Sequence, residues 1–399
     1  MIEDWLIADL EIGRSLKYRC AWIGIIVLVC LTTLAGCGGG WQTTMVGPDG
    51  AETVISRATW RDLREFVGED SDVEKDTALL LERVLYQHGY HLIETLTVTT
   101  PEGTTRDYDW ASIAETATWR INGTLTLGED TLRRASRISG SVPKIASAVT
   151  ASLADIAPTA AAVLGLPAPA QATGHPLTDT RAGHVLLLFL DGFGYLRYTE
   201  ARDAGLIPTL AALGEPQVGL SEYPPSTAIA TAVMVTGAPP AVNGTAIRGT
   251  RTTEVETLFD VATRAGLHVV AVEGDALAFN LRNTEVILSG DRDNNGSTDD
   301  NVLANTLAVL DAGMPDILWV HFHGIDDAGH TYGPHAPEAD ATIAGVDAAV
   351  GDILAALPPD TLALIFADHG MHLVQEEGRL GNHGNLTARD MLVPVWVVK

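Results

Sequence analysis

Apolar and polar positions follow two different patterns along the chain. From about residue 184 onward, continuous apolar runs alternate with amphipathic stretches, which is typical of buried parallel strands alternating with helices. The predicted strands are Val185–Leu190, Val218–Tyr223, His268–Val272, Ile317–Phe322, Leu362–Ala367 and Val393–Val398. The predicted helices are Ile207–Leu213, Ala228–Val235, Val255–Ala265, Asn301–Leu310 and Glu338–Leu357. This alternation predicts an α/β fold built on a doubly wound, mostly parallel sheet with helices on both faces.

Residues 38–140 have a different pattern, in which the pieces ETVIS, HLIETLTVTT and TWRINGTLTLG are typical of short strands separated by turn residues. Asp76–Tyr90 is predicted to be an amphipathic helix. Its candidate core positions are Leu79, Leu80, Leu81, Val84 and Leu85. We therefore expect a small α+β domain over 38–140, in which we find no catalytic constellation, followed by a catalytic domain over 141–399.

Polar residues with metal-binding or nucleophilic side chains stand where several of the predicted strands end. Asp191 follows Val185–Leu190 directly, and the spacing D-x-x-x-H occurs in a glycine-rich loop after Ile317–Phe322. In doubly wound sheets, ligands bind beyond the carboxyl ends of the strands. The candidate site residues are Asp191, Thr227, Asp326, His330, Asp368, His369 and His383. Each of them alone could be an ordinary turn or helix-capping residue, whereas their combination indicates one site.

The chemistry of these residue types points to metal-assisted catalysis. Carboxylates together with neutral imidazoles suit zinc or similar divalent ions. Thr227 precedes the predicted helix Ala228–Val235, so its hydroxyl would meet free backbone N–H groups and the positive end of the helix dipole. A nearby metal ion would also lower the pKa of that hydroxyl, which would make Thr227 a nucleophile.

The charge of the chain limits its partners. The formal net charge is −26, from 25 basic and 51 acidic residues, and the basic residues form no evident stripe. We therefore expect no nucleic-acid binding, which needs clustered positive charge. A small phosphorylated substrate is compatible with this charge, because bound metal ions can invert the local field.

The first 37 residues have the features of a signal peptide. Basic residues precede an apolar stretch, Ala21–Leu34, that is too short to span a membrane comfortably. The stretch ends in LAGC, which resembles the lipobox of bacterial lipoproteins and implies cleavage before Cys37 and lipidation of its thiol. Cys20 and Cys30 would be removed, so the mature chain would form no internal disulfide. We expect an extracytoplasmic protein that is attached to the bacterial membrane through its lipid.

The ordered set of site residues resembles the type I phosphodiesterase/nucleotide pyrophosphatase branch of the alkaline phosphatase superfamily, over residues 184–399. The resemblance implies an alkaline-phosphatase-like fold and a two-metal hydrolase of phosphoric diesters or monoesters. One Zn²⁺, or a similar divalent ion, would be held by Asp191, Thr227, Asp368 and His369. The other would be held by Asp326, His330 and His383. Thr227 would attack phosphorus and form a phosphothreonine intermediate that is then hydrolysed.

The chain departs from this family at the positions expected to contact substrate. Ala228 stands where members that act on nucleotides often carry an aromatic residue. In PAVNGTAIRG, Asn243 replaces a histidine and Arg248 replaces an asparagine that binds a phosphate oxygen, so both are candidate contacts to the substrate phosphate. A sulfatase is disfavoured because the sequence around Thr227 lacks C/S-x-P-x-R. The alternatives are a phosphomutase-like enzyme and a non-catalytic cell-envelope lipoprotein that keeps the fold for binding.

A short acidic segment offers a candidate calcium loop. Its oxygen ligands would be Asp291, Asp293, Asn295 and Asp299, with Gly296 at the turn. However, Val302 stands where an EF-hand loop needs a bidentate glutamate. We therefore favour a solvated turn that caps the following helix over a Ca²⁺ site.

Residues 150–177 resemble a segment that normally follows the last metal-binding histidine in this superfamily and closes the domain. Here the segment precedes the first motif, which indicates a circular permutation; the alternative is an alanine-rich linker helix. Permutation predicts that the helix Ile156–Leu164 packs against the catalytic sheet near Val393–Val398. The contacting side chains would be Ile156, Ala161, Val163 and Leu164.

Overall fold

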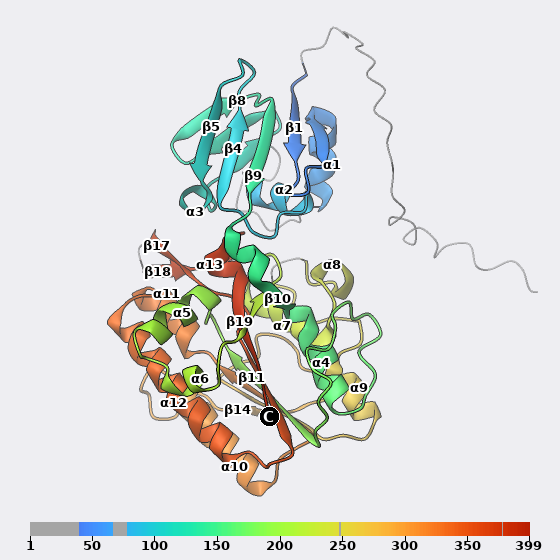
Figure 1. Ribbon diagram of the computed structural model, residues 1–399, viewed down its shortest axis with the longest axis vertical. Helices are drawn as coiled ribbons and strands as arrows, with labels where there is room; N and C mark the ends of the chain where they lie inside the picture. Colours follow the sequence, from blue (N-terminus) through green and yellow to red (C-terminus); the bar gives the residue numbers. More distant parts are fainter. Residues whose placement is uncertain (1–39, 67–77, 247–248, 377) are drawn as a thin grey trace, which may run out of the picture. The chain divides into compact units, whose positions relative to one another are not determined.

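The computed structural model describes residues 40–66, 78–246, 249–376 and 378–399. An eight-stranded sheet forms the centre of the larger domain, with strand order β10-β12-β19-β16-β11-β15-β13-β14 (Figure 1). Its strands are β10 (Val149–Ser152), β11 (His184–Leu190), β12 (Gln217–Leu220), β13 (Val269–Glu273), β14 (Glu285–Leu288), β15 (Ile317–Phe322), β16 (Thr361–Phe366) and β19 (Leu392–Val398). All neighbouring strands are parallel except β19, which runs antiparallel to β12 and to β16. The predicted doubly wound, mostly parallel α/β fold is confirmed.

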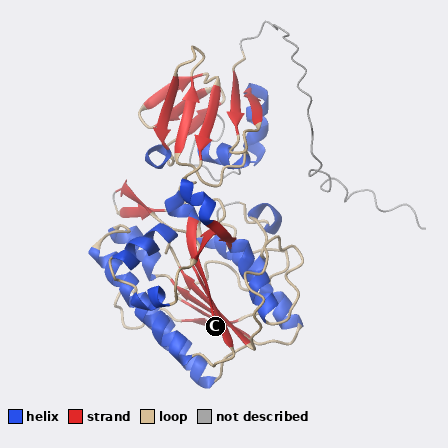
Figure 2. Ribbon diagram, viewed as in Figure 1, coloured by secondary structure: helices blue, strands red, loops and turns tan. Residues whose placement is uncertain are grey.

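Helices cover both faces of this sheet, as Figures 1 and 2 show. One layer contains α5 (Tyr195–Asp203), α6 (Pro208–Ala212), α10 (Asp299–Ala312), α11 (Gly324–Tyr332) and α12 (Pro337–Ala356). The other contains α4 (Ile156–Val163), α7 (Thr227–Thr236) and α9 (Leu258–Arg264), and α7 is followed by α8 (Pro240–Asn243). Because both faces are covered, the central strands are apolar throughout, and every side chain of Val185–Leu190 is buried. Each such Val, Leu or Phe contributes about 1.5–3 kcal/mol through burial.

The register of the central strands aligns their carboxyl ends. Leu190 of β11 pairs with Phe322 of β15, and Phe189 pairs with Phe366 of β16. The three strands therefore end at one edge of the sheet. The residues that follow them in sequence are brought together there.

The segment before β11 belongs to this sheet rather than to a linker. β10 pairs in parallel with β12, from Val149 opposite Val218 to Ser152 opposite Leu220. Helix α4 contacts β16, the neighbour of β19, and Ile156, Ala161 and Val163 are buried in the same core as Val393. Leu164 packs against that core while partly buried. Helix α4 thus packs on the sheet, but its contacts are with β16, so the predicted packing near Val393–Val398 and the permutation of the chain stay predictions. Strand β10 was not predicted.

The N-terminal α+β part of the fold contains two antiparallel-rich sheets with orders β2-β1-β9-β4-β5 and β3-β6-β7-β8. Residues 40–399 make one compact unit, so its division into two domains at residue 140 stays a prediction. The strands of the N-terminal part are β1 (Gln42–Val46), β2 (Glu52–Ser56), β3 (Ala78–Leu80), β4 (Thr95–Thr99), β5 (Thr105–Asp109), β6 (Thr118–Arg120), β7 (Thr124–Leu127), β8 (Asp130–Arg133) and β9 (Arg137–Ser141). Its helices are α1 (Arg57–Phe66), α2 (Leu81–Gln87) and α3 (Trp110–Ile113). The predicted helix Asp76–Tyr90 was too long, because Leu79 and Leu80 lie in β3. A run of three leucines fits a buried strand and a helix face equally well.

A hairpin and a short helix lie near the end of the chain. The hairpin β17 (His372–Glu376) and β18 (Arg379–Asn382) precedes the short helix α13 (Ala388–Met391). Around α13, Leu386, Met391 and Tyr223 are buried in one apolar cluster with Leu85, Trp110 and other core residues of the N-terminal domain.

None of the helices in the described ranges is long and apolar enough to cross a membrane. The predicted signal peptide and Cys37 lie outside the described residues.

Candidate functional site

Asp191 and Asp368 meet at the carboxyl ends of β11 and β16. Both side chains are buried, and Asp368 Oδ1 accepts the backbone N–H of Gly192 at 3.1 Å. The Asp191 N–H donates to Phe322 O at 3.0 Å, which fixes the turn after β11 against β15. Gly192 has φ +73°, and a Cβ there would lie 3.0 Å from Asp326. The glycine therefore lets the element that carries Asp326 approach this turn closely.

That element is helix α11, so the expectation that Asp326 and His330 lie in a loop was wrong. Two glycines suggested a loop, but Ile325 and Ala328 are buried on the inner face of a regular helix. Asp299 stabilises its start by accepting the N–H groups of His323 and Gly324, each at 3.0 Å. The one-turn spacing places His330 Nε2 3.1 Å from Asp326 Oδ2.

Three imidazoles are oriented by backbone carbonyl groups. His369 Nδ1 donates to Gly370 O at 3.1 Å, His383 Nδ1 to Pro225 O at 2.9 Å and His330 Nδ1 to Gly381 O at 2.7 Å. A carbonyl oxygen only accepts, so each Nδ1 carries a hydrogen, and Nε2 keeps its lone pair whenever the imidazole is neutral. Metal-binding histidines are oriented in this way in proteins.

The ligand atoms of two overlapping groups converge within 4.8 Å: Asp191, Asp368 and His369 form one, and Asp326, His369 and His383 form the other. His369 Nε2 lies 3.2 Å from Asp368 Oδ2 and 3.6 Å from Asp191 Oδ1. Within the described residues, Asp191 Oδ1, Asp326 Oδ1 and Asp368 Oδ2 are buried and accept no hydrogen bond. Such oxygens are costly to bury unless a cation satisfies them, so this arrangement fits divalent metal ions.

His330 is not in either group, among the residues that the structure describes. Its Nε2 also receives a contact from Arg379 Nη2 at 3.0 Å, which uses the lone pair that a metal ion would take. The metal-binding role of His330 stays a prediction, and it requires Arg379 to move away from the imidazole.

Thr227 is the first residue of α7, and Ser226 stands before it in extended conformation as the N-cap. The Thr227 hydroxyl lies 3.4 Å from His369 Nε2. It therefore stands where the metal-binding groups meet the free N–H groups at the start of a helix.

Burial and neighbouring charges shift the pKa values of the side chains in this centre. Burial, followed by the charges of Asp368 and Asp326, raises the pKa of Asp191 well above its usual value. Burial also opposes ionisation of Asp326, yet its hydrogen bond with His330 and the proximity of His383 hold the pKa of Asp326 well below its usual range. For His383, burial and then His369 lower the pKa well below its usual value. Burial opposes protonation of His369, but the charges of Asp368, Asp326 and Asp191 outweigh it and raise the pKa of His369. A metal cation would take the place of that proton, because it binds the neutral imidazole.

The predicted substrate contact Asn243 forms its hydrogen bonds within its own loop. Asn243 is buried at the end of α8, where its Nδ2 donates to Ala238 O at 2.8 Å and its Oδ1 accepts from Thr245. These bonds direct the amide into its own loop. Arg248 lies outside the described residues.

The candidate calcium loop is held together by its own hydrogen bonds. Asp291 accepts the N–H groups of Asn295 and Gly296, and Asn295 Nδ2 donates to Asp293. Asp299 instead binds the backbone at the start of α11. The loop forms the turn before α10, and the preference for a solvated turn over a Ca²⁺ site stays a prediction.

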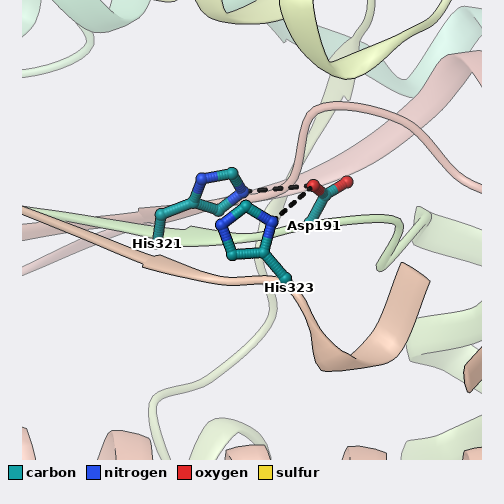
Figure 3. A group of neighbouring side chains, drawn as sticks. All are labelled: Asp191, His321 and His323. Atoms are coloured by element: carbon teal, nitrogen blue, oxygen red, sulfur yellow. Dashed lines mark hydrogen bonds and ion pairs between the residues drawn. The ribbon is translucent and has the colours of Figure 1, made fainter. Parts of the chain in front are cut away.

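Two groups of residues near the centre were not identified from the sequence. Asp390 accepts from His372 Nδ1 at 2.9 Å and from the N–H groups of Gly384 and Asn385, which holds the loop that carries His383. His321 and His323 contact Asp191 from the side of β15 (Figure 3). The signal was present as H-F-H at the end of Ile317–Phe322, since alternate residues of a strand share a face.

Comparison with known proteins agrees with this site. The family model of type I phosphodiesterase/nucleotide pyrophosphatase matches residues 185–390. The catalytic subunit of GPI ethanolamine phosphate transferase 3 from Mus musculus is 34% identical over 82 residues, which are 21% of this chain and 8% of that protein. Its Homo sapiens counterpart is 31% identical over 94 residues, which are 24% of this chain and again 8% of the relative. The chain thus matches only a small part of these relatives.

Among solved structures, phosphonoacetate hydrolase from Sinorhizobium meliloti 1021 in complex with phosphonoacetate is 21% identical. The comparison covers 53% of this chain and 59% of the hydrolase, with a TM-score of 0.40. The family match is the stronger finding, because it covers just over half of the chain and includes all seven candidate site residues. This chain belongs to the type I phosphodiesterase/nucleotide pyrophosphatase family.

Proposed function

We propose that the chain is a metal-dependent hydrolase of phosphoric diesters or monoesters that uses Thr227 as its nucleophile. The observation that carries this proposal is the position of the Thr227 hydroxyl, 3.4 Å from His369 Nε2 at the start of α7. Beside it lie three buried carboxylate oxygens that accept no hydrogen bond within the described residues. A nucleophile next to strongly ligating groups is the arrangement expected for phosphoryl transfer.

Two divalent ions, with Zn²⁺ suited to the nitrogen and oxygen ligands, would complete the site. Asp191, Thr227, Asp368 and His369 would hold one ion, and Asp326, His330 and His383 would hold the other. When bound, such ions stabilise negative charge on phosphoryl oxygens and favour the deprotonated hydroxyl.

The protein residues position the reacting groups. The free N–H groups in the first turn of α7 would bind oxygens of the transferred phosphoryl group, as helix N-termini bind phosphate. Thr227 Oγ1 forms a bond to phosphorus while the bond to the leaving oxygen breaks. The threonine proton is released to solvent, and the leaving oxygen takes up a proton from solvent and departs as an alcohol. Water then hydrolyses the phosphothreonine, which releases phosphate or a phosphomonoester and restores the hydroxyl.

A phosphotransferase is the second candidate, because the matched relatives are named as ethanolamine phosphate transferases. In that case an alcohol, rather than water, would take the phosphoryl group from Thr227. A phosphomutase-like enzyme and a non-catalytic binding lipoprotein are less well supported. The proposed ligands and the nucleophile are all present, and a binding protein would not need them.

We also propose a small phosphorylated substrate and a lipid anchor at Cys37 outside the cytoplasm. The acidic net charge of −26 supports a small substrate over nucleic acid.

The test uses nitrophenyl phosphate and bis-nitrophenyl phosphate as substrates, before and after metal removal with a chelator. We expect turnover of at least one ester, its loss on chelation and its return on addition of Zn²⁺. Acid quenching during turnover should leave a phosphoryl group on the peptide that contains Thr227. Transfer to an added alcohol in preference to water would establish the transferase instead. Absence of turnover in the metal-loaded protein on a broad ester panel would contradict both.

A further inference from the structure

A second group of histidines, His321 and His323, contacts Oδ2 of Asp191, whereas His369 faces Oδ1. His321 is the fifth residue of β15, and His323 follows the strand directly, so both imidazoles project from one face. Figure 3 shows both rings directed at the Asp191 carboxylate. The two rings lie 3.7 Å apart between centroids, with 36° between their planes. His321 is buried, whereas the side chain of His323 is 22% exposed.

Glu273, the last residue of β13, orients both imidazoles. Its Oε2 lies 2.8 Å from His321 Nδ1 and 3.3 Å from His323 Nε2. Its Oε1 accepts from Trp319 Nε1 at 2.8 Å, which fixes the carboxylate in the core. As an acceptor, Glu273 places a hydrogen on the nearer nitrogen of each imidazole.

The other nitrogen of each imidazole faces Asp191. His321 Nε2 lies 3.1 Å from Asp191 Oδ2, and His323 Nδ1 lies 3.8 Å from the same oxygen. Two imidazole lone pairs and a carboxylate oxygen therefore converge in the interior. They repel one another unless a metal ion or a shared proton lies between them, and the 3.1 Å contact fits either.

We propose that His321 Nε2, His323 Nδ1 and Asp191 Oδ2 form a third divalent-cation site, for Zn²⁺ or a similar transition-metal ion. Zinc bonds of 2.0–2.1 Å in tetrahedral geometry place neighbouring ligand atoms about 3.3 Å apart. The observed separations of 3.1 and 3.8 Å bracket this value. Glu273 is the outer carboxylate that orients metal-binding histidines, here for two of them at once.

This site extends the proposed function, because it shares Asp191 with the two-metal centre. Oδ1 of Asp191 faces His369 at 3.6 Å, while Oδ2 faces His321. Asp191 would thus bridge the third ion and the catalytic ions. The partial exposure of His323 gives the third ion a route from solvent.

The competing arrangement has a proton on His321 in place of the metal ion, which would pair the imidazole with Asp191 and Glu273. The zinc content of the protein distinguishes the protonated arrangement from the metal-bound one. The full-length protein, equilibrated with Zn²⁺ and desalted, would be compared with His323→Ala and with His335→Ala by elemental analysis. His335 is a control because it pairs with Glu200, away from Asp191.

We expect His323→Ala to hold one ion per chain fewer than the wild type, and His335→Ala to hold the same number. Equal zinc content in all three proteins would overturn the third site and assign the proton to the imidazole. Glu273→Gln is the second variant, and it should weaken the affinity for that same ion about 10–100-fold. Unchanged zinc affinity in Glu273→Gln would also count against the site.

A parallel variant separates this inference from the proposed function. Asp326→Asn removes a ligand of the two-metal centre without touching His321 or His323. If Asp326→Asn keeps its full zinc content while His323→Ala loses one ion, the third site stands and the two-metal proposal fails. If only Asp326→Asn loses zinc, the two-metal proposal stands and the third site fails.

Discussion

At the scale of single residues, the groups that the nitrogens of each imidazole contact decide whether Nε2 is free to bind a metal ion. A backbone carbonyl at Nδ1 leaves the Nε2 lone pair of His369 and His383 directed inward. His330 has the same carbonyl contact, but Arg379 occupies its Nε2. The surrounding backbone, rather than the histidine itself, decides which nitrogen can bind a metal ion.

Replacement of Thr227 tests the nucleophile directly. Thr227→Ala removes the attacking oxygen, so turnover of an activated ester should fall by roughly 10³-fold or more. Zinc content should stay nearly unchanged, because carboxylates and imidazoles supply most of the ligands. Thr227→Ser should keep part of the activity.

Thr231→Ala is the matched control for this prediction. Thr231 lies one turn further along α7, and its hydroxyl is buried with no hydrogen-bond partner in the described residues. It should retain near wild-type kcat and KM. Full activity in Thr227→Ala would show that water attacks the ester directly.

Residue types and their order led to the seven candidate site residues, because a strand end shows in the sequence as the place where an apolar run stops. The structure brings Asp191, Asp326, Asp368, His369 and His383 together, and their functional roles stay predictions. His321, His323 and Glu273 were missed for a physical reason. The contacts of Glu273 with the two histidines form because β13 and β15 are neighbours in the sheet. The order of strands in a sheet cannot be predicted from a single apolar run. His321 also resembles an ordinary core position, since β15 is buried along its whole length.

At the scale of secondary-structure elements, the predicted strands agree with the structure to within a few residues. The ends of a continuous apolar run mark closely where a buried strand begins and ends. Helix α11 was read as a loop, since Gly324 and Gly329 lower helix propensity. Packing of Ile325 and Ala328 outweighs that cost. β10 was not predicted, because its four residues, VTAS, carry no apolar run.

The close approach of α11 to the end of β11 can be tested with a pair of glycines. Gly192 and Gly205 share φ +73°, but only Gly192 has Asp326 beside its missing Cβ. Gly205→Ala should cost about 1–2 kcal/mol, the strain of the left-handed conformation alone. Gly192→Ala should cost more and should also reduce kcat, because its Cβ displaces Asp326. Equal losses of stability and full activity in both variants would show that the contact is unimportant.

The hairpin β17–β18 should make stability depend on pH. Burial disfavours the charged form of His372, but hydrogen bonds with Asp390 and Glu115 raise its pKa to about 9. A raised pKa in the folded state stabilises the protein fully below the unfolded value of about 6.5. This contribution, at most about 3 kcal/mol, is lost as the pH rises from about 6.5 through about 9.

Denaturant titrations at about pH 6 and about pH 9.5 would measure this loss, and His372→Gln should reduce the difference between the two. His268→Gln is the control, because His268 pairs with Glu285 at an exposed position. The interpretation would be wrong if His372→Gln retained the full pH dependence of the wild type.

At the scale of the whole molecule, the N-terminal domain and the catalytic domain share an apolar cluster. Tyr223, Leu386 and Met391 are buried in it together with Leu85 and Trp110. The small-domain fold class was predictable from its short alternating strands. The shared cluster was not, since neither region carries an apolar patch that is recognisable in sequence as an interface.

Deletion variants test how the chain is divided. Removal of residues 38–180 takes away β10 and α4, which exposes an edge and a face of the catalytic sheet, so we expect insoluble protein. Removal of 38–140 keeps both elements and should be better tolerated, although exposure of Tyr223 and Met391 should lower solubility. Solubility and ester turnover of the two fragments give the comparison. A soluble, active 181–399 fragment would contradict the assignment of 150–177 to the catalytic domain.

The shared cluster also couples ligand binding at the centre to the stability of the N-terminal domain. Tyr223 lies four residues before Thr227, and Leu386 lies three residues after His383, so the cluster holds the chain on both sides of the catalytic centre. Anything that binds at the centre must therefore stabilise the N-terminal domain through thermodynamic linkage. The N-terminal domain carries the buried tryptophans Trp60, Trp110 and Trp119. Their fluorescence on heating would then report occupancy of a site to which none of them belongs.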